Sequence, residues 1–191
     1  MERLYLASEL YFRSLKKEDW KSVHDYASQE VVSRYQSWGP NTERDTLAYV
    51  EDVLNQEKVI PQTRYVHALV DEGVNKVIGA GELIIKSFAH RRGEIGYILH
   101  PDYWGKGLGT LVAGALIDKG FSELNLHKIS ATCNPQNIPS ERVLVKVGMT
   151  LEGRIRHHMK LNDGWRDSLL YGILEGEWKV GDRHDGIADQ G

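Results

Sequence analysis

Three glycines at alternate positions, Gly105, Gly107 and Gly109, are the residues of this sequence best suited to binding a charged group. They lie between an apolar run at 95–99, which predicts a strand, and an amphipathic run at 108–119, which predicts a helix. Glycines in such a loop let backbone N–H groups point inward together, and the following helix N-terminus adds partial positive charge. The spacing therefore predicts a site for phosphate oxygens.

Two common phosphate-binding motifs do not fit this loop. A P-loop requires G-x-x-x-x-G-K-[ST], but the residue five positions after Gly105 is Thr110. A dinucleotide fingerprint requires G-x-G-x-x-G in a βαβ unit, and these glycines have a different spacing. A sharp turn into a helix is the simpler alternative, but such a turn needs one special glycine rather than three.

Hydrophobic periodicity predicts one mixed α/β sheet that positions the loop. The predicted strands are 10–13, 65–70, 76–85, 91–99, 128–133, 150–161 and 165–174, and helices are expected after residues 17, 42, 107 and 137. Thr42 and Asp45 have the spacing of an acidic capping box, and Asn137 has the place of an N-cap. We expect one domain over residues 8–178, with residues 179–191 as a flexible tail.

Composition narrows the functional class. The chain has 191 residues and is 41% hydrophobic, which is enough for one core. A net charge of −3 and a pI of about 6.2 give no global basic footprint for nucleic acid. The single cysteine, Cys133, excludes an internal disulfide and suits a reducing cytosol. Without a long apolar run for a membrane span or a signal peptide, we expect a cytoplasmic protein that contacts neither membrane nor nucleic acid directly.

The order of several short motifs resembles the GNAT superfamily of N-acetyltransferases. The family's acetyl-CoA signature is [Q/R]-x-x-G-x-[G/A], and Gly107 and Gly109 match its last two conserved places. Trp104 stands where Arg or Gln is usual, but a Tyr-Trp-Gly-Lys-Gly run is typical of the Rim-type branch, the ribosomal-protein N-terminal acetyltransferases and their relatives. The other matching pieces, spread over roughly residues 8–178, are Arg13, Glu94 to Tyr97, Asn137-x-x-Ser140-x-x-Val143-Leu144, and Asp167 to Tyr171.

The resemblance implies a GNAT fold, in which a mixed and mostly antiparallel sheet is flanked by helices and binds acetyl-CoA as a co-substrate. In the family, the strand before the glycine loop separates from the next strand, and the pantetheine arm lies in the gap. Backbone groups of Ile98, Leu99 and His100 would bind that arm and the acetyl oxygen. The loop would hold the pyrophosphate mainly through backbone amides, and its residues are Trp104, Gly105, Lys106, Gly107, Leu108, Gly109 and Thr110.

The resemblance also implies a proton donor for the departing CoA thiolate. Many family members carry a tyrosine seven positions after the helix-opening asparagine, but that position is Leu144 here, which cannot donate a proton. The Rim-type branch uses a serine three positions after the asparagine, which is Ser140, while Asn137 would bind the pantetheine arm. From the residues alone, the favoured role of Ser140 is to satisfy a backbone N–H in the first helical turn.

Glu94 is the candidate base, acting through water. Strand alternation places it on the same face as Gly96 and Ile98. It could equally be a structural carboxylate paired with an Arg or Lys. His157 and His158 are adjacent on a predicted strand and no acidic or Cys cluster with ligand spacing lies nearby, so we expect no metal site.

The sequence thus predicts an acetyl-CoA-dependent N-acetyltransferase that acts on a primary amine by direct attack in a ternary complex. The acceptor stays open between a protein N-terminal α-amine of the ribosomal-protein type and a small amine or antibiotic. The alternative is a non-catalytic acyl-CoA-binding or regulatory module of the same fold. A monomer and a homodimer are both compatible with the sequence.

Overall fold

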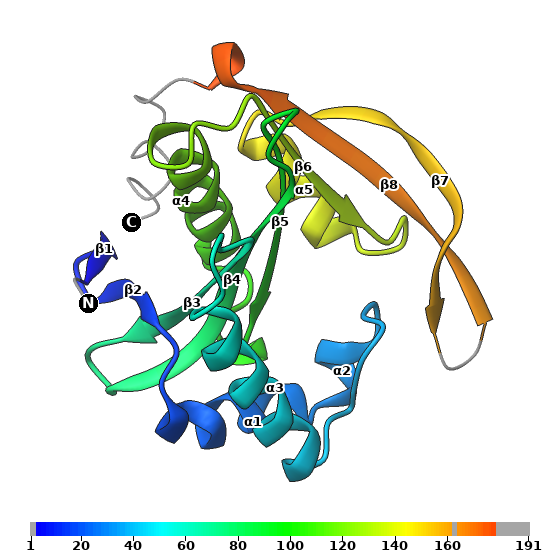
Figure 1. Ribbon diagram of the computed structural model, residues 1–191. Coiled ribbons are helices and arrows are strands. Elements are labelled where there is room, and N and C mark those ends of the chain that lie inside the picture. Colours follow the sequence, from blue (N-terminus) through cyan, green and yellow to red (C-terminus); the bar gives the residue numbers. More distant parts are fainter. Residues whose placement is uncertain (1–2, 162–163, 179–191) are drawn as a thin grey trace, which may run out of the picture.

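An eight-stranded sheet with the strand order β1-β2-β3-β4-β5-β6-β8-β7 forms the centre of the protein (Figure 1). The computed structural model describes residues 3–161 and 164–178. The strands are β1 (Leu4–Ala7), β2 (Leu10–Ser14), β3 (Arg64–Asp71), β4 (Lys76–Ser87), β5 (Arg92–Leu99), β6 (Lys128–Cys133), β7 (Thr150–Leu161) and β8 (Gly164–Leu174). Neighbouring strands are antiparallel except β5 and β6, which are parallel.

Helices cover both faces of this sheet. They are α1 (Trp20–Ala27), α2 (Glu30–Ser33), α3 (Glu43–Gln56), α4 (Leu108–Ser122) and α5 (Ile138–Lys146), with short 3₁₀ helices η1 (Lys17–Asp19), η2 (Pro101–Tyr103) and η3 (Glu175–Glu177). Side chains alternate along β3, so that Leu69 joins the core under α4 while Ala68 joins the core under α1 and α3. The predicted α/β fold, a mostly antiparallel sheet flanked by helices, is confirmed. None of these helices is long and apolar enough to cross a bilayer.

β5 and β6 separate after a short stretch of pairing. Their register joins Arg92–Glu94 to Lys128–Ser130, although β5 continues to Leu99 and β6 to Cys133. Beyond Glu94, the edge of β5 that faces β6 therefore has no strand neighbour. The gap implied by the family resemblance is present, and it positions the candidate site.

Local signals begin two of the helices as predicted. The Thr42 hydroxyl accepts from the Asp45 N–H, and the Asp45 carboxylate accepts from the Thr42 N–H at 2.9 Å, which is a capping box at the start of α3. The Asn137 side-chain oxygen accepts from the Ser140 N–H at 3.2 Å and caps α5. These caps fix where each helix enters the site.

Two features differ from the sequence predictions. Strand β1 lies before residue 8, where we expected the domain to begin, and it pairs with β2. Helix α4 continues past Gly120, which we expected to follow its end, because Gly120 faces the sheet. A Cβ at Gly120 would lie 2.5 Å from the Ile129 Cδ1, so the glycine permits close packing rather than ending the helix. Residues 162–163, between the predicted strands 150–161 and 165–174, and the predicted tail at 179–191 lie outside the described residues.

Candidate active site

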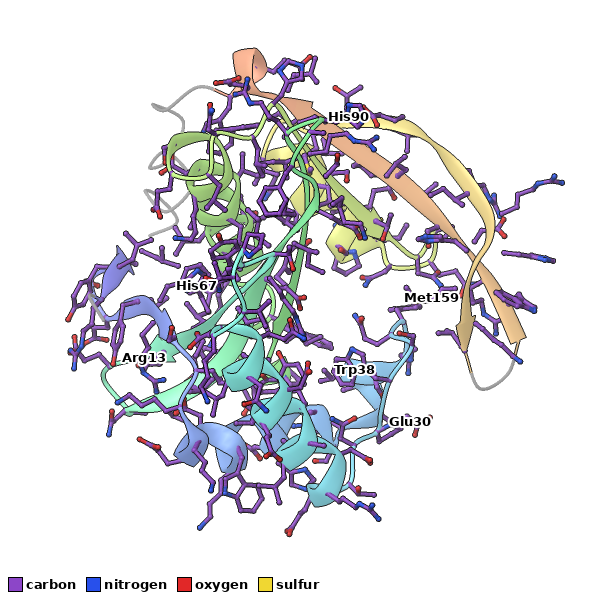
Figure 2. All side chains as sticks on the ribbon, in the orientation of Figure 1. Arg13, Glu30, Trp38, His67, His90 and Met159 are labelled. Atoms are coloured by element: carbon purple, nitrogen blue, oxygen red, sulfur yellow. The ribbon has the colours of Figure 1, made fainter. Side chains whose placement is uncertain are left out.

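A cleft of about 630 Å³ opens where β5 and β6 separate. Its walls come from β5, the glycine loop, the first turn of α4, the end of β6, α5 and the β7–β8 hairpin, whose Met159 is labelled in Figure 2. His100 and Lys106, both predicted to bind the cofactor, do not belong to this lining. The predicted residues that do line the cleft are Glu94, Ile98, Leu99, Trp104, Gly105, Gly107, Leu108, Gly109, Thr110, Asn137 and Ser140.

Glycine is required at the three loop positions for different structural reasons. Gly105 and Gly107 have φ angles of +75° and +77°, which other residues rarely adopt, and Gly107 is the N-cap of α4. Gly109 instead allows close packing of α4 on α5, because a Cβ there would lie 3.0 Å from the Val143 Cγ2. Two of the glycines thus shape the loop, and the third sets the position of the helix behind it.

The loop presents a row of free backbone donors. Within the described part of the chain, the N–H groups of residues 105–109 donate to no backbone carbonyl, whereas the Thr110 N–H donates to the Gly107 carbonyl at 3.1 Å. Free N–H groups at the start of a 15-residue helix form a site for anionic oxygens. The donor set therefore fits a pyrophosphate.

Backbone polar groups of β5 alternate between β4 and the cleft. The His100 N–H donates to the Ile78 carbonyl at 2.8 Å, so it already has a partner in β4. Ile98 lies two residues earlier and pairs with Ala80, so its N–H and C=O also turn towards β4. Of the three predicted backbone positions on this strand, these two therefore do not face the gap.

Tyr97 and Leu99 turn their backbone groups to the gap instead. The Leu99 carbonyl there already accepts from the Trp104 indole N–H at 2.9 Å, which ties the glycine loop to the end of β5. The Leu99 N–H and both backbone groups of Tyr97 face the cleft. If the strand that pairs with either edge of β5 were known, strand alternation would identify Tyr97 from the sequence as a residue whose backbone groups face the gap.

Ser140 and Tyr97 form a pair of hydroxyl groups inside the cleft. The Ser140 Oγ lies 3.1 Å from the Tyr97 Oη. Burial raises the pKa of Tyr97 to about 12, so this hydroxyl keeps its proton at neutral pH. Leu144, at the position where many family members carry a tyrosine, is fully buried and apolar. Tyr97 is thus a candidate functional residue that the sequence reasoning missed.

Glu94 lines the cleft and also has a cationic partner. Its carboxylate lies 3.2 Å from the Lys86 Nζ, and about a third of the side chain (32%) is exposed. An ion pair of this exposure contributes little stability. The exposed part of the side chain leaves the carboxylate accessible to water. Both predicted alternatives for Glu94, a base and a structural partner, are compatible with this geometry.

A second cavity of about 730 Å³ lies against α1 and α3. It shares Gly96, Tyr97 and Ile98 of β5 with the first cleft, so the two cavities meet at these residues. A Cβ added at Gly96 would meet no atom within 4 Å. Trp38, labelled in Figure 2, lines the second cavity, whereas Tyr35 lines the first cleft.

The remaining chemistry-bearing residues have structural contacts. Burial raises the pKa of the Cys133 thiol to about 11, so the thiol stays protonated. His158 lies 3.0 Å from the Ser168 hydroxyl, and His157 stacks on Trp165 with ring centroids 6.4 Å apart. Among residues 3–161 and 164–178, no three His, Cys, Asp or Glu side chains gather to hold a metal ion.

Comparisons with known proteins agree with the geometry. Residues 9–150 match the acetyltransferase (GNAT) domain. The uncharacterized N-acetyltransferase YnaD of Bacillus subtilis is 37% identical over 169 residues, which cover 88% of this chain and 95% of that protein. Spermidine N(1)-acetyltransferase of Escherichia coli is 30% identical over 173 residues, which cover 90% of this chain and 89% of that enzyme.

A solved structure with CoA-disulfide bound has a similar fold. RimJ of Mycobacterium smegmatis, in complex with CoA-disulfide, matches with a TM-score of 0.80 at 21% identity, over 92% of this chain and 86% of that one. At this identity the match supports the fold alone. The domain match and the identity to YnaD, over a fold with the expected gap and glycine loop, show that this chain belongs to the GNAT family of N-acetyltransferases.

Proposed function

We propose that the chain transfers the acetyl group of acetyl-CoA to a primary amine by direct attack in a ternary complex. The observation that carries this proposal is the meeting of two cavities at Gly96. One cavity has the free N–H groups and the Ser140–Tyr97 pair, and the other lies against α1 and α3. A donor in the first and an amine in the second would meet inside the protein.

The free donors suggest how the cofactor lies. We place its pyrophosphate at the N–H groups of residues 105–109 and its pantetheine arm along the open edge of β5. There the Leu99 N–H and the backbone groups of Tyr97 would bond the arm. The Asn137 side-chain oxygen accepts from Ser140, which leaves its NH₂ group for the arm. Acetyl-CoA supplies an acetyl group activated as a thioester.

The proton balance assigns separate roles to the polar side chains. An ammonium acceptor loses two protons when it becomes an amide, while the departing CoA sulfur gains one. Glu94 would take one proton through water and pass it to solvent. Ser140 would protonate the sulfur as the C–S bond breaks, and the Tyr97 hydroxyl at 3.1 Å would replace the proton on Ser140. The second proton lost by the amine would return to Tyr97 through water, so that both hydroxyls end the cycle protonated.

Two classes of acceptor are supported by different observations. A small aliphatic polyamine is supported by the similarity to a spermidine acetyltransferase and by Asp45 and Glu82 in the second cavity. A protein N-terminal α-amine is supported by its chemistry. With a pKa of about 8 it is roughly a fifth neutral at pH 7.4, against about a thousandth for an amine of pKa ~10.4.

The test is acetyl-CoA consumption, followed as free thiol release, with polyamines, free-N-terminus peptides, lysine peptides and aminoglycosides. N-acetylated peptides without lysine are the matched control, because they lack the attacking amine. We expect turnover with one class, which would also identify the acceptor. Acetyl-CoA binding without turnover on any amine would favour the non-catalytic module, and absence of binding would overturn the proposal.

A further inference from the structure

Two tyrosine hydroxyls in the second cavity have no role in the fold. Tyr26 of α1 is 2% exposed, and Tyr49 of α3 lines the same cavity. Within the described residues, neither hydroxyl has a hydrogen-bond partner. Burial raises the pKa of both groups, that of Tyr49 to about 12, so both stay neutral. Both tyrosines line the cavity and their hydroxyls have no protein partner, so these hydroxyls are available to a ligand that enters it.

A carboxylate lies on the adjoining wall of this cavity. Glu82 of β4 is the cross-strand partner of Gly96, where the two cavities meet. Its carboxylate accepts from the Arg64 Nε at 2.7 Å, and the same guanidinium binds Asp52 at 2.7 Å. One guanidinium is thus shared by two carboxylates, and the group of three has a net charge of −1. Asp52 does not line the cavity but Asp45 does, so the lining carries two carboxylates and one guanidinium and favours a cation.

Glu82, Tyr26 and Tyr49 all line the second cavity. The charge of Glu82 contributes to the raised pKa of Tyr49. An ammonium group carries three N–H donors, and one carboxylate and two hydroxyl oxygens offer three acceptors. Aromatic rings also attract cations, as the Arg64 guanidinium 5.9 Å from the Tyr49 ring centre illustrates.

We propose that Glu82, Tyr26 and Tyr49 bind the amino group of the acceptor as an ammonium and deliver it to the first cleft past Gly96. The inference rests on the proposed function and adds the residues that select the acceptor, a cationic aliphatic primary amine. Two carboxylates on one face of the sheet, those of Glu82 and Glu94, thereby have different roles. Glu82 lines the second cavity, whereas Glu94 lines the first cleft and pairs with Lys86.

The experiment compares Tyr26→Phe, Glu82→Gln and Glu94→Gln with the wild-type enzyme. Kinetics are measured against spermidine, 1,4-diaminobutane and a free-N-terminus peptide at saturating acetyl-CoA. Spermidine binding in the presence of CoA is measured by calorimetry, so that binding is tested even without turnover. We expect Glu82→Gln to raise the amine KM and Kd at least ~10-fold and Tyr26→Phe roughly 3- to 10-fold, with the acetyl-CoA Kd unchanged within about 2-fold.

Two controls separate binding from folding. Tyr26→Phe removes no hydrogen bond within the described residues, so a higher amine KM in that variant is not a folding defect. Tyr5→Phe and Glu123→Gln make the same chemical changes at residues that line neither cavity. If Glu82→Gln unfolds because Arg64 loses its ion-pair partner, the variants Tyr26→Phe and Gly96→Val test the proposal instead. The valine fits without a clash at its Cβ but narrows the passage, so we expect lower turnover.

The failures of the two proposals are distinguishable. Unchanged amine KM and Kd in both Tyr26→Phe and Glu82→Gln, in an enzyme that consumes acetyl-CoA, would overturn this inference alone. A raised amine KM in Glu94→Gln but not in Glu82→Gln would also overturn it and assign the amine to the first cleft. A wild-type protein that does not bind acetyl-CoA would overturn the proposed function.

Discussion

At the residue scale, the hydroxyl pair of Ser140 and Tyr97 gives a direct test of proton donation. We expect Ser140→Ala to lower kcat roughly 10²-fold, because general acid catalysis is worth about that much, while the acetyl-CoA Kd stays nearly constant. Tyr97→Phe should have a smaller effect, since the Ser140 hydroxyl remains and can exchange protons with water. Assays of free thiol release measure kcat of both variants, and acetyl-CoA titrations measure their acetyl-CoA Kd. An unchanged kcat in Ser140→Ala, with a good acceptor, would contradict the assignment.

The sequence could predict some of these residues and not others. Ser140 and Asn137 were selected through the family resemblance of one short motif, which is local information, and both line the cleft. Tyr97 and Ser140 are 43 residues apart and meet because α5 packs against α4 and β6 beside β5. Glu82 becomes a candidate only when the register of β4 and β5 places it opposite Gly96. Contacts set by tertiary structure were therefore missed, while positions set by a helix cap were not.

At the element scale, the loop between β5 and α4 depends on backbone conformation. Gly107 has φ of +77° and open space around its Cβ position, so an alanine there meets no steric clash but is strained by about 1–2 kcal/mol. The strain is relieved by rotating the loop, which turns its N–H groups away from a common point. We expect Gly107→Ala to weaken acetyl-CoA binding at least ~10-fold, measured by calorimetry.

Gly114→Ala, within α4, is the matched control. Its Cβ would have an ordinary contact with Trp178 at 3.7 Å, and alanine favours a helix interior by about 1 kcal/mol over glycine. This variant should keep its acetyl-CoA affinity and be at least as stable as the wild type. Equal affinities in Gly107→Ala and the wild type would show that the phosphate site lies elsewhere.

Secondary-structure elements could be predicted from the sequence where their signals lie in a few consecutive residues. The capping box at Thr42 and the cap at Asn137 were predicted because each needs only a few consecutive residues. Strand β1 was missed because its pairing with β2 is a contact of two segments, and the burial pattern of β1 has no buried position. Gly120 was misinterpreted because a glycine for close packing and a glycine for ending a helix look alike in one sequence.

At the scale of the whole molecule, His67 links stability to pH. His67 is labelled in Figure 2. Its Nε2 is buried without a hydrogen-bond partner among the described residues, and the ring stacks on Phe12. Burial, helped by the charge of Lys119, lowers the pKa of His67 to about 4. Between pH 6.5 and 4 the unfolded chain therefore binds a proton that the folded chain does not. Stability from this residue is complete above pH 6.5 and falls as the pH drops, by up to about 1.4 kcal/mol per pH unit.

The variant His67→Phe should remove this part of the pH dependence. Urea unfolding at pH 7.5, 6.0 and 5.0 measures the free energy of unfolding, and we expect the loss between pH 6.5 and 5 to be smaller in the variant. The same change at His90, which is exposed, is the control and should leave the pH profile as in the wild type. Identical profiles for His67→Phe and the wild type would contradict a buried neutral imidazole.

The early separation of β5 and β6 has a consequence for turnover. In the proposed placement, the contacts along the open edge of β5 and at the glycine loop are made with the arm and the pyrophosphate, which the reaction does not alter. Spent CoA keeps all of them and loses only those of its acetyl group. The affinity of the enzyme for CoA is therefore almost as high as its affinity for acetyl-CoA. When free CoA accumulates, release of CoA rather than formation of the amide would limit the rate.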